Sequence, residues 1–419
     1  MRILHTVESY LPARHGMQEV VSQTSERLVR MGHEVTVATS TNPERVENII
    51  NGVRVEGFAI SGNMVNGYGG DLAERERYQH LLREGDFDIV TNFAAQQWAT
   101  DLALPILDEI KARKVLVPTG FSGLFLGSYR DYFEKMSGWM RLYDMNVLLS
   151  DTYRDARFAA EHGIENRVLI PNGASEEEFE AEAAFSLRER LRIPADAFLV
   201  LLVGSHTGMK GHREAIRIFD DARISNAVLL IVGNYCDTVA PAFSIRTWAR
   251  GVVRRLLRRA QDECPRFCRA AEGNFNGKER WRSAGKRLLF ADLERCATVM
   301  AYREADLFLF PSRVECSPIV LFEAAASRTP FLATDVGNAA EIAAWTGGGA
   351  ILPTSHDRKG YAQADIGGSA AMIEELWRDT DRRRRMADAG HTAWRERFTW
   401  ESVAIKYLQL YHTLLMSKT

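Results

Sequence analysis

Two closely spaced glutamates in an otherwise apolar stretch are the side chains in this sequence best suited to chemistry. Glu315 follows an apolar run that ends at Phe310, and Glu323 lies about one and a half turns inside the helix that Ser317-Pro318 predicts. A carboxylate accepts two hydrogen bonds at a fixed spacing, which matches a cis-diol. Acids in so apolar a segment are costly without partners. On its own, the pair also fits two surface glutamates of an ordinary helix.

Two elements of the sequence could bind a pyrophosphate. The helix that begins near Ser317 offers free backbone amides and the positive end of its dipole. The Gly-rich turn over 203–211 carries Lys210, which taken alone also fits a solvated lysine. A lysine and helix amides can stabilise negative charge without a metal. The acidic pair Asp86-Phe87-Asp88 precedes a strand and is not placed to bind a metal, so we expect no metal and no cofactor beyond the donor substrate.

Short apolar strands alternate with helical stretches along most of the chain, which is typical of parallel α/β sheets. A helix with one apolar face follows the first strand, with Gly32 at its end, and another lies near the end of the chain. Because ligands bind where strand ends and helix starts converge, two such halves predict a site in an interdomain cleft. The predicted strands are Ile3–Val7, Glu34–Thr39, Ile89–Thr91, Lys114–Val117, Val147–Ser150, Val168–Ile170, Phe198–Val203, Val228–Val232, Leu307–Phe310 and Phe331–Thr334.

Length and composition predict two globular domains in a reducing compartment. The chain has 419 residues, 46% of them hydrophobic and 26% charged, with a formal net charge of −2 that does not favour nucleic acid as a partner. We expect residues 1–178 with 400–419 to form one domain and 179–399 the other. The start does not resemble a signal peptide, and Cys264-x3-Cys268 has no matching His or Cys pair after it, so we expect reduced thiols in the cytoplasm.

One segment, residues 241–287, interrupts this pattern. It is rich in Lys and Arg, contains no clear strand and includes an amphipathic stretch with several arginines on one face. An arginine-rich amphipathic helix suits an anionic membrane surface, and a peripheral position at the inner leaflet is one interpretation. A solvated face packed on the second domain, or a contact with another subunit, is the alternative and ranks slightly ahead. Nucleic-acid binding ranks low because the cluster lacks interleaved aromatic residues.

Several ordered motifs resemble the retaining family-4 glycosyltransferases of the GT-B fold (glycosyl transferases group 1). The pair Glu315 and Glu323 resembles that family's Glu-x7-Glu motif, and the turn over 203–211 resembles its phosphate loop. The resemblance covers nearly the whole chain except the basic segment. It implies two Rossmann-like domains facing across a cleft, with the last helix crossing back to the first domain. Further matching motifs are Arg30–Val37, Leu149-Ser150, Ile170–Gly173 and Thr334–Glu341.

The resemblance also implies roles for particular residues. Lys210 would bind the donor pyrophosphate and Glu323 the ribose, while Glu315 would orient the transferred sugar. Gly16, in the loop after the first strand, would let backbone amides approach the phosphates and the acceptor. The resemblance implies front-face displacement in which the leaving phosphate helps to deprotonate the acceptor. The donor-binding positions that it implies are Ser205, Cys316, Ser317, Pro318, Ile319 and Val320.

The sequence departs from the family pattern at three positions. Ser205 replaces an arginine of the phosphate loop, for which His206, His212 or Arg213 could compensate, and Thr119-Gly120 replaces a His-Gly pair. The paired glycines of the first loop are reduced to Gly16. From the resemblance we predict a retaining, hexosyltransferase-type glycosyltransferase that moves a sugar from a nucleoside-diphosphate sugar to a hydroxyl of a glycan, lipid-linked or small-molecule acceptor, in polysaccharide, lipopolysaccharide or glycoconjugate biosynthesis. One alternative is a catalytically weak glycosyltransferase-like protein that binds nucleotide or forms a complex. Another is a GT-B epimerase or an NAD enzyme. The NAD enzyme is disfavoured because no Gly-x-Gly-x-x-Gly turn follows the first strand.

Overall fold

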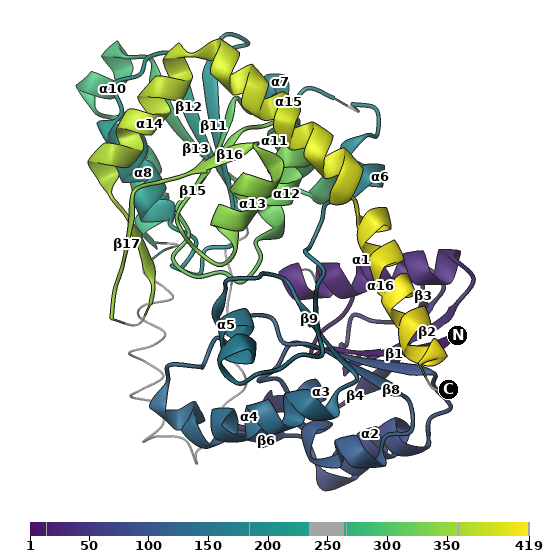
Figure 1. The fold of residues 1–419 in the computed structure, drawn as a ribbon. Helices are drawn as coiled ribbons and strands as arrows, with labels where there is room; N and C mark the ends of the chain where they lie inside the picture. The colour runs from purple at the N-terminus through teal and green to yellow at the C-terminus, as the bar shows by residue number, and fades with distance from the viewer. Residues whose placement is uncertain (14, 184, 234–263, 265, 359, 418–419) are drawn as a thin grey trace. The chain divides into compact units, whose positions relative to one another are not determined.

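The computed structural model describes residues 1–13, 15–183, 185–233, 264, 266–358 and 360–417. These residues form two compact units, each of which is built around its own sheet (Figure 1). The first unit comprises Met1–Ser175, Cys316–Ile319 and Glu396–Thr419, and the second comprises Glu176–Glu315 and Val320–Arg395. The amphipathic stretch of the basic segment lies within 234–263, outside the described residues.

The first unit contains an eight-stranded sheet that is parallel except at one edge. Its order is β10-β9-β8-β7-β1-β2-β4-β3, and β3 alone in this sheet runs antiparallel to its neighbour. The strands are β1 (Arg2–Thr6), β2 (Glu34–Ser40), β3 (Ile49–Ile50), β4 (Val53–Phe58), β7 (Ile89–Phe93), β8 (Arg113–Val117), β9 (Met145–Leu148) and β10 (Arg167–Leu169), with a separate hairpin of β5 (Ser61–Asn63) and β6 (Gly67–Gly69). The helices are α1 (Gly16–Arg30), α2 (Leu72–Glu84), α3 (Trp98–Asp101), α4 (Arg130–Leu142), α5 (Arg154–Glu161) and α16 (Trp400–Met416).

The second unit contains a parallel six-stranded sheet. Its order, β13-β12-β11-β14-β15-β16, is 3-2-1-4-5-6 in chain order within the unit, the order of a doubly wound dinucleotide-binding fold. The strands are β11 (Phe198–Val203), β12 (Ala227–Val232), β13 (Lys286–Ala291), β14 (Leu307–Phe310), β15 (Phe331–Ala333) and β16 (Gly349–Ile351), beside a hairpin of β17 (Thr354–His356) and β18 (Ala362–Ala364). The helices are α6 (Glu176–Phe179), α7 (Leu187–Arg190), α8 (His212–Asp221), α10 (Glu279–Ser283), α11 (Arg295–Glu304), α12 (Ile319–Ala326), α13 (Ala339–Thr346), α14 (Ile366–Arg378) and α15 (Thr380–Arg397).

The predicted strands are all present, but the basic segment was interpreted wrongly at its end. Strand β13 begins at Lys286, inside the segment 241–287 that we expected to contain no strand, and pairs along its whole length with β12. The Lys286 ammonium is buried and donates hydrogen bonds to the carbonyl oxygens of Phe219 (2.5 Å) and Ala222 (2.8 Å). Strand β13 was not predicted because its first two residues, Lys286 and Arg287, are charged, although its other residues are apolar.

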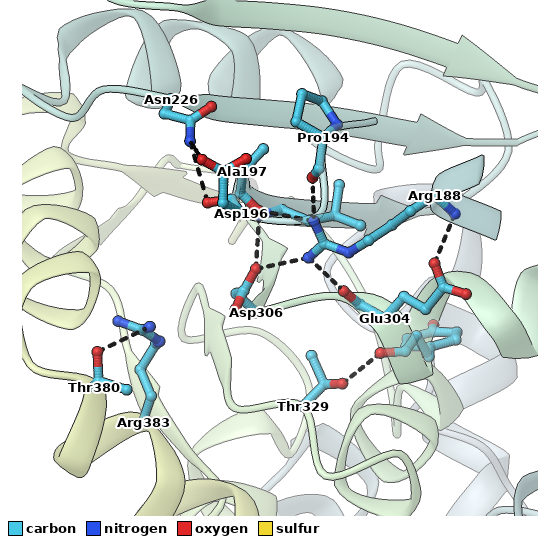
Figure 2. A network of polar contacts seen from close by, with 12 residues as sticks. Arg188, Pro194, Asp196, Ala197, Asn226, Glu304, Asp306, Thr329, Thr380 and Arg383 are labelled. Atoms are coloured by element: carbon cyan, nitrogen blue, oxygen red, sulfur yellow. Dashed lines mark hydrogen bonds and ion pairs between the residues drawn. The ribbon is translucent and has the colours of Figure 1, made fainter. Parts of the chain in front are cut away.

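The amino ends of the two central strands of the second sheet are held by one arginine (Figure 2). Arg188 donates to the carbonyl oxygens of Pro194 (3.0 Å) and Ala197 (2.8 Å), just before β11. It also pairs with Asp306, immediately before β14, at 3.0 Å. Asp306 in turn accepts from the Leu199 amide at 2.9 Å. The network fixes β11 against β14 at their amino ends, and the two loops that follow these strands start at the opposite, carboxyl ends.

Helix α16 completes the core of the first unit. Its buried face, which includes Trp400, Tyr407 and Tyr411, packs in one cluster with residues of β1 and α1 (Figure 1). The Tyr411 hydroxyl lies 3.1 Å from His5 Nε2 and 2.8 Å from Thr91 Oγ1. The predicted return of the last helix to the first domain is therefore confirmed. The C-terminal residues of the chain are part of the N-terminal fold.

The buried His5 gives this docking a pH dependence that can be measured. Its Nδ1 lies 2.8 Å from Ser25 Oγ on α1, and burial lowers the pKa of His5 from 6.5 to about 3. Between these pH values the unfolded chain binds a proton that the folded chain does not, so stability falls as the pH falls. From pH 7 to pH 5 the loss from His5 should be about 2 kcal/mol. Urea unfolding of the parent and of His5→Gln at both values checks this, because the variant should lose less stability; equal losses would contradict it.

Candidate donor site in the second unit

The carboxyl ends of β11 and β14 mark the point where the strand order of the second sheet reverses. In open α/β sheets, ligands bind outside the strand ends at such a point. The loop after β11 runs from Gly204 to Gly211, and the loop after β14 runs from Pro311 to Pro318. These are the two segments that the sequence analysis selected as phosphate loop and Glu-x7-Glu motif.

The two loops contact each other through a charged pair. Lys210 Nζ lies 2.6 Å from Glu315 Oε1, and the side chains are 29% and 13% exposed. Ser312, which is fully buried, donates from Oγ to the same carboxylate oxygen at 2.7 Å. The structure thus brings Lys210 and Glu315 together, and their roles in donor binding stay predictions. The lysine remains accessible enough to exchange its carboxylate partner for a phosphate.

Glycine at position 211 makes this approach feasible. Its φ of +71° lies in the left-handed region, and a Cβ atom at this position would lie 1.9 Å from the Pro311 carbonyl oxygen. The Arg313 amide donates to the Met209 carbonyl at 2.8 Å, which joins the loops a second time. The loop conformation that presents Lys210 therefore depends on a residue without a side chain.

Glu323 is buried on α12 and is already paired with a cation. It is 5% exposed, and its Oε1 lies 2.7 Å from Arg295 Nη2 on α11. Arg295 also binds Glu178, with Nε to Oε1 at 2.9 Å and Nη2 to Oε2 at 2.5 Å. Burial acts to lower the pKa of Arg295, but attraction to Glu323 and Glu178 outweighs it and raises the pKa. The sequence analysis missed this partner, since neither Arg295 nor Glu178 stands in a recognisable motif.

The helix start near Ser317 differs in one detail from the prediction. Helix α12 begins at Ile319, so Pro318 rather than Ser317 precedes its first residue, and Ser317 does not cap it. The buried Ser317 hydroxyl makes no hydrogen bond within the described part of the chain. Its carbonyl accepts from Asn172 Nδ2 at 3.1 Å, within the first unit. A buried hydroxyl without a partner at a helix start is compatible with a bound oxyanion.

The departures from the family pattern have clear local structures. Ser205 is half-buried, and its carbonyl accepts from the Thr207 amide at 2.8 Å. His206 and His212 do not compensate for the replaced arginine, because both are 2% exposed and both lie beside the thiol of Cys264. The expectation that either might substitute for the arginine is therefore wrong. Arg213, the third candidate, lies with its guanidinium carbon 4.7 Å from the Phe267 ring centroid.

The first unit has its own strand reversal, between β1 and β7. Gly16 lies nearby as the first residue of α1 rather than in a loop, and the preceding His15 caps that helix by accepting from the Gln18 amide. His15 Nε2 also contacts Ser9 Oγ. The Glu8 amide donates to Gln97 Oε1 at 3.2 Å, which joins the two loops. The role of Gly16 in donor binding stays a prediction, and His15, which directly precedes the helix start in the sequence, was not predicted as its cap.

Strained backbone marks the end of β8 in the same unit. Thr119, Gly120 and Phe121 have φ values of +59°, +90° and +46°. A β-branched residue in the left-handed region costs free energy, and such residues concentrate at functional sites. This is the segment in which the sequence has Thr119-Gly120 in place of the His-Gly pair. The Gly120 amide donates to Asp155 Oδ2 at 2.9 Å, which helps to fix it.

Two family models match this chain over separate stretches. Residues 14–178 match the family described as Glycosyltransferase Family 4, and residues 294–366 match Glycosyl transferases group 1. The chain is 31% identical over 118 residues to a D-inositol 3-phosphate glycosyltransferase of Corynebacterium urealyticum (strain ATCC 43042 / DSM 7109). That match spans 28% of this chain and 25% of the relative.

Solved structures of similar fold extend over the whole chain. A sucrose-phosphate synthase from Thermosynechococcus elongatus aligns with a TM-score of 0.74 at 18% identity and covers 100% of both chains. The Anabaena protein Alr3699/HepE, solved in complex with UDP and glucose, aligns with a TM-score of 0.67 at 14% identity and covers 99% of this chain and 100% of that one. The fold that they share with this chain is GT-B, with two Rossmann-like domains. The chain belongs to the family-4, group-1 glycosyltransferases.

Proposed function

We propose that this protein transfers a sugar from a nucleoside-diphosphate sugar to a hydroxyl group of a glycan, a lipid-linked acceptor or a small molecule. The contact of Lys210 Nζ with Glu315 Oε1, at 2.6 Å and at the strand reversal of the second sheet, carries this proposal. It supplies a cation where a pyrophosphate would bind and a carboxylate where a sugar hydroxyl would donate. Family membership supports the same reaction class.

The reaction has a simple balance. The acceptor oxygen forms a bond to the anomeric carbon, the bond from that carbon to the phosphate oxygen breaks, and the acceptor proton passes to the leaving phosphate. Lys210 would stabilise the charge that develops on that phosphate, together with the amides at the start of α12. We propose that the sugar keeps its anomeric configuration and that no metal ion takes part in the transfer.

Residues of α12, of the loop before it and of two other loops would make the remaining contacts with the donor and the acceptor. Glu323 would hold the ribose hydroxyls with the carboxylate oxygen that Arg295 leaves available. The residues Cys316–Val320 would contact the phosphates through backbone amides, and Ser317 through its hydroxyl as well. In the first unit, Gly16 and the neighbouring His15 would bind the acceptor or the outer phosphate. Ser205 would add a hydroxyl where the family has an arginine.

A second function is favoured by two specific observations. Ser205 and Thr119 replace the arginine and the histidine of the family pattern, and neither buried histidine of the phosphate loop takes over the arginine's place. A protein that binds a nucleotide sugar but turns it over slowly would fit these replacements. Such a protein would act as a nucleotide-binding or complex-forming partner.

A panel of UDP- and GDP-sugars separates the two functions. We expect at least one donor to be hydrolysed slowly without acceptor, with release of its nucleoside diphosphate, because water can replace a hydroxyl acceptor. A coupled diphosphate assay measures the release, and calorimetry measures binding of the same donors. Binding without release, with acceptors also supplied, would favour the partner function. Neither binding nor release for any donor would contradict both.

The cellular setting of the reaction is also a proposal. Polysaccharide, lipopolysaccharide and glycoconjugate biosynthesis all supply hydroxyl acceptors of the required kind. Within the described residues, no helix has both the length and the apolar composition needed to cross a membrane. A peripheral contact through residues 241–287 would be tested by liposome co-sedimentation of the parent and of a variant in which Arg250, Arg254, Arg255, Arg258 and Arg259 are replaced by glutamine.

A further inference from the structure

Four buried side chains with metal-binding atoms converge beside the phosphate loop. They are His206 and His212, at either end of the segment that contains Lys210, and Cys264 and Cys268 from the described part of the basic segment. Their ligand atoms all lie within 4.8 Å of one another. Cys264 Sγ lies 3.2 Å from His212 Nδ1, 3.8 Å from His206 Nδ1 and 3.9 Å from Cys268 Sγ.

These separations fit a tetrahedral site. Zinc binds thiolate sulfur at about 2.3 Å and imidazole nitrogen at about 2.0–2.1 Å, so ligand atoms at tetrahedral corners lie roughly 3.3–3.8 Å apart. The three distances from Cys264 fall close to that range without rearrangement. Two imidazoles and two thiols are also the ligand combination that favours zinc over magnesium or calcium.

The surroundings of the cluster favour a closed structural site. The four residues are between 0% and 4% exposed, which leaves no open position for a substrate. His212 Nε2 lies 3.1 Å from the Gly204 carbonyl oxygen, so this nitrogen carries the proton and Nδ1 offers its lone pair toward the thiols. Such an outer hydrogen bond is the usual way in which a ligating imidazole is oriented.

We propose that His206, His212, Cys264 and Cys268 bind one zinc ion. Binding replaces the two thiol protons, so each chain takes up Zn²⁺ and releases two protons as the two thiolates form. The ion joins both ends of the loop that presents Lys210 to the helix that carries the cysteines. It is a structural ion and takes no part in the sugar transfer.

Electrostatics within the cluster agree with the proposal. Hydrogen bonding with Cys268, and then with His206 and His212, lowers the pKa of the Cys264 thiol, although burial opposes the shift. The same contact with Cys264, together with burial, raises the pKa of Cys268.

Metal content of the purified full-length chain tests the site directly. The chain is prepared without a polyhistidine tag, under reducing conditions, and its zinc is measured by elemental mass spectrometry. We expect about one zinc per chain in the parent, as one closed four-ligand site requires. Cys264→Ser/Cys268→Ser should lose it, and Cys296→Ser, which changes an exposed thiol, should keep it. Removal of the ion should lower Tm by roughly 5–10 °C in the parent and leave the double variant unchanged.

Cobalt substitution provides a readout that does not depend on the folding of a variant. The parent chain loaded with Co²⁺ should show the intense visible bands of a tetrahedral ion and a thiolate-to-cobalt charge-transfer band. A parent chain that stays free of zinc and gives no such spectrum would overturn the proposal. So would a Cys264–Cys268 disulfide, detected as the loss of two hydrogens by mass, or a double variant with the parent's zinc content. None of these outcomes depends on sugar transfer.

Discussion

Replacing Lys210 by alanine is expected to lower kcat/KM for sugar transfer about 10²–10³-fold, because one preorganised charge at a leaving group contributes on that scale. The effect should fall mainly on kcat, since the charge on the leaving phosphate grows as its bond to the sugar breaks. Lys210 is 29% exposed and its carboxylate partner keeps the hydrogen bond from Ser312, so the fold should tolerate the change. Diphosphate release at saturating donor measures kcat.

The matched control is Lys278→Ala. Lys278 is also a lysine of the second unit in a single-carboxylate ion pair, with Asp220 at 3.1 Å, but it lies beside α10 rather than in the phosphate loop. It should leave kcat/KM within about twofold of the parent, as is usual for exposed ion pairs. Glu315→Gln is a third variant. Glutamine keeps the shape of the Glu315 side chain and removes the negative charge that pairs with Lys210. Parent-like turnover by Lys210→Ala would contradict the proposed role of the loop.

Replacing Glu323 by glutamine is expected to weaken nucleotide binding by about 10–100-fold, which corresponds to the loss of charge-assisted hydrogen bonds to a ribose diol. Glu323 is 5% exposed and holds Arg295, so its replacement also removes a buried ion pair. Calorimetric titration with UDP and GDP, alongside urea unfolding, separates the two effects.

Glu374→Gln is the control for the loss of stability that follows when a buried, paired glutamate is neutralised. Glu374 is likewise 5% exposed in the second unit and pairs with two arginines, Arg223 at 3.3 Å and Arg378 at 3.0 Å. Both variants should therefore lose stability of similar size, and only Glu323→Gln should lose nucleotide affinity. Equal nucleotide affinity in the two variants would show that Glu323 is a structural residue alone.

Strands and the order of the motifs were predictable from the sequence because they are local properties. The strands β11 and β14 match their predicted bounds to the residue, since each is an uninterrupted apolar run. Strand β4 was missed because Arg54, Glu56 and Gly57 interrupt its apolar residues, and β13 was missed because it starts with two charged residues. Both strands were overlooked because only continuous apolar runs were sought, whereas Val53, Val55 and Phe58 of β4 are buried residues separated by polar ones.

Contacts between distant residues could not be predicted in the same way. The sequence placed Lys210 and Glu315 in separate loops, and only the resemblance to a family suggested a shared ligand. Arg295 as the partner of Glu323 followed from no motif at all. The His and Cys cluster was missed for a specific reason: a matching pair was sought only after Cys268, whereas the fold supplies two histidines that precede the cysteines.

The discontinuity of both units limits how this chain can be dissected. Because α16 fills the core of the first unit, a fragment that ends near Ser175 would expose the apolar surface that Tyr407 and Tyr411 cover. A fragment that begins near Glu176 and retains α16 would in turn carry an unsupported apolar helix. Separate expression of the first unit therefore requires residues 1–175 to be joined by a linker to 396–419, and a single proteolytic cut should not release two soluble halves.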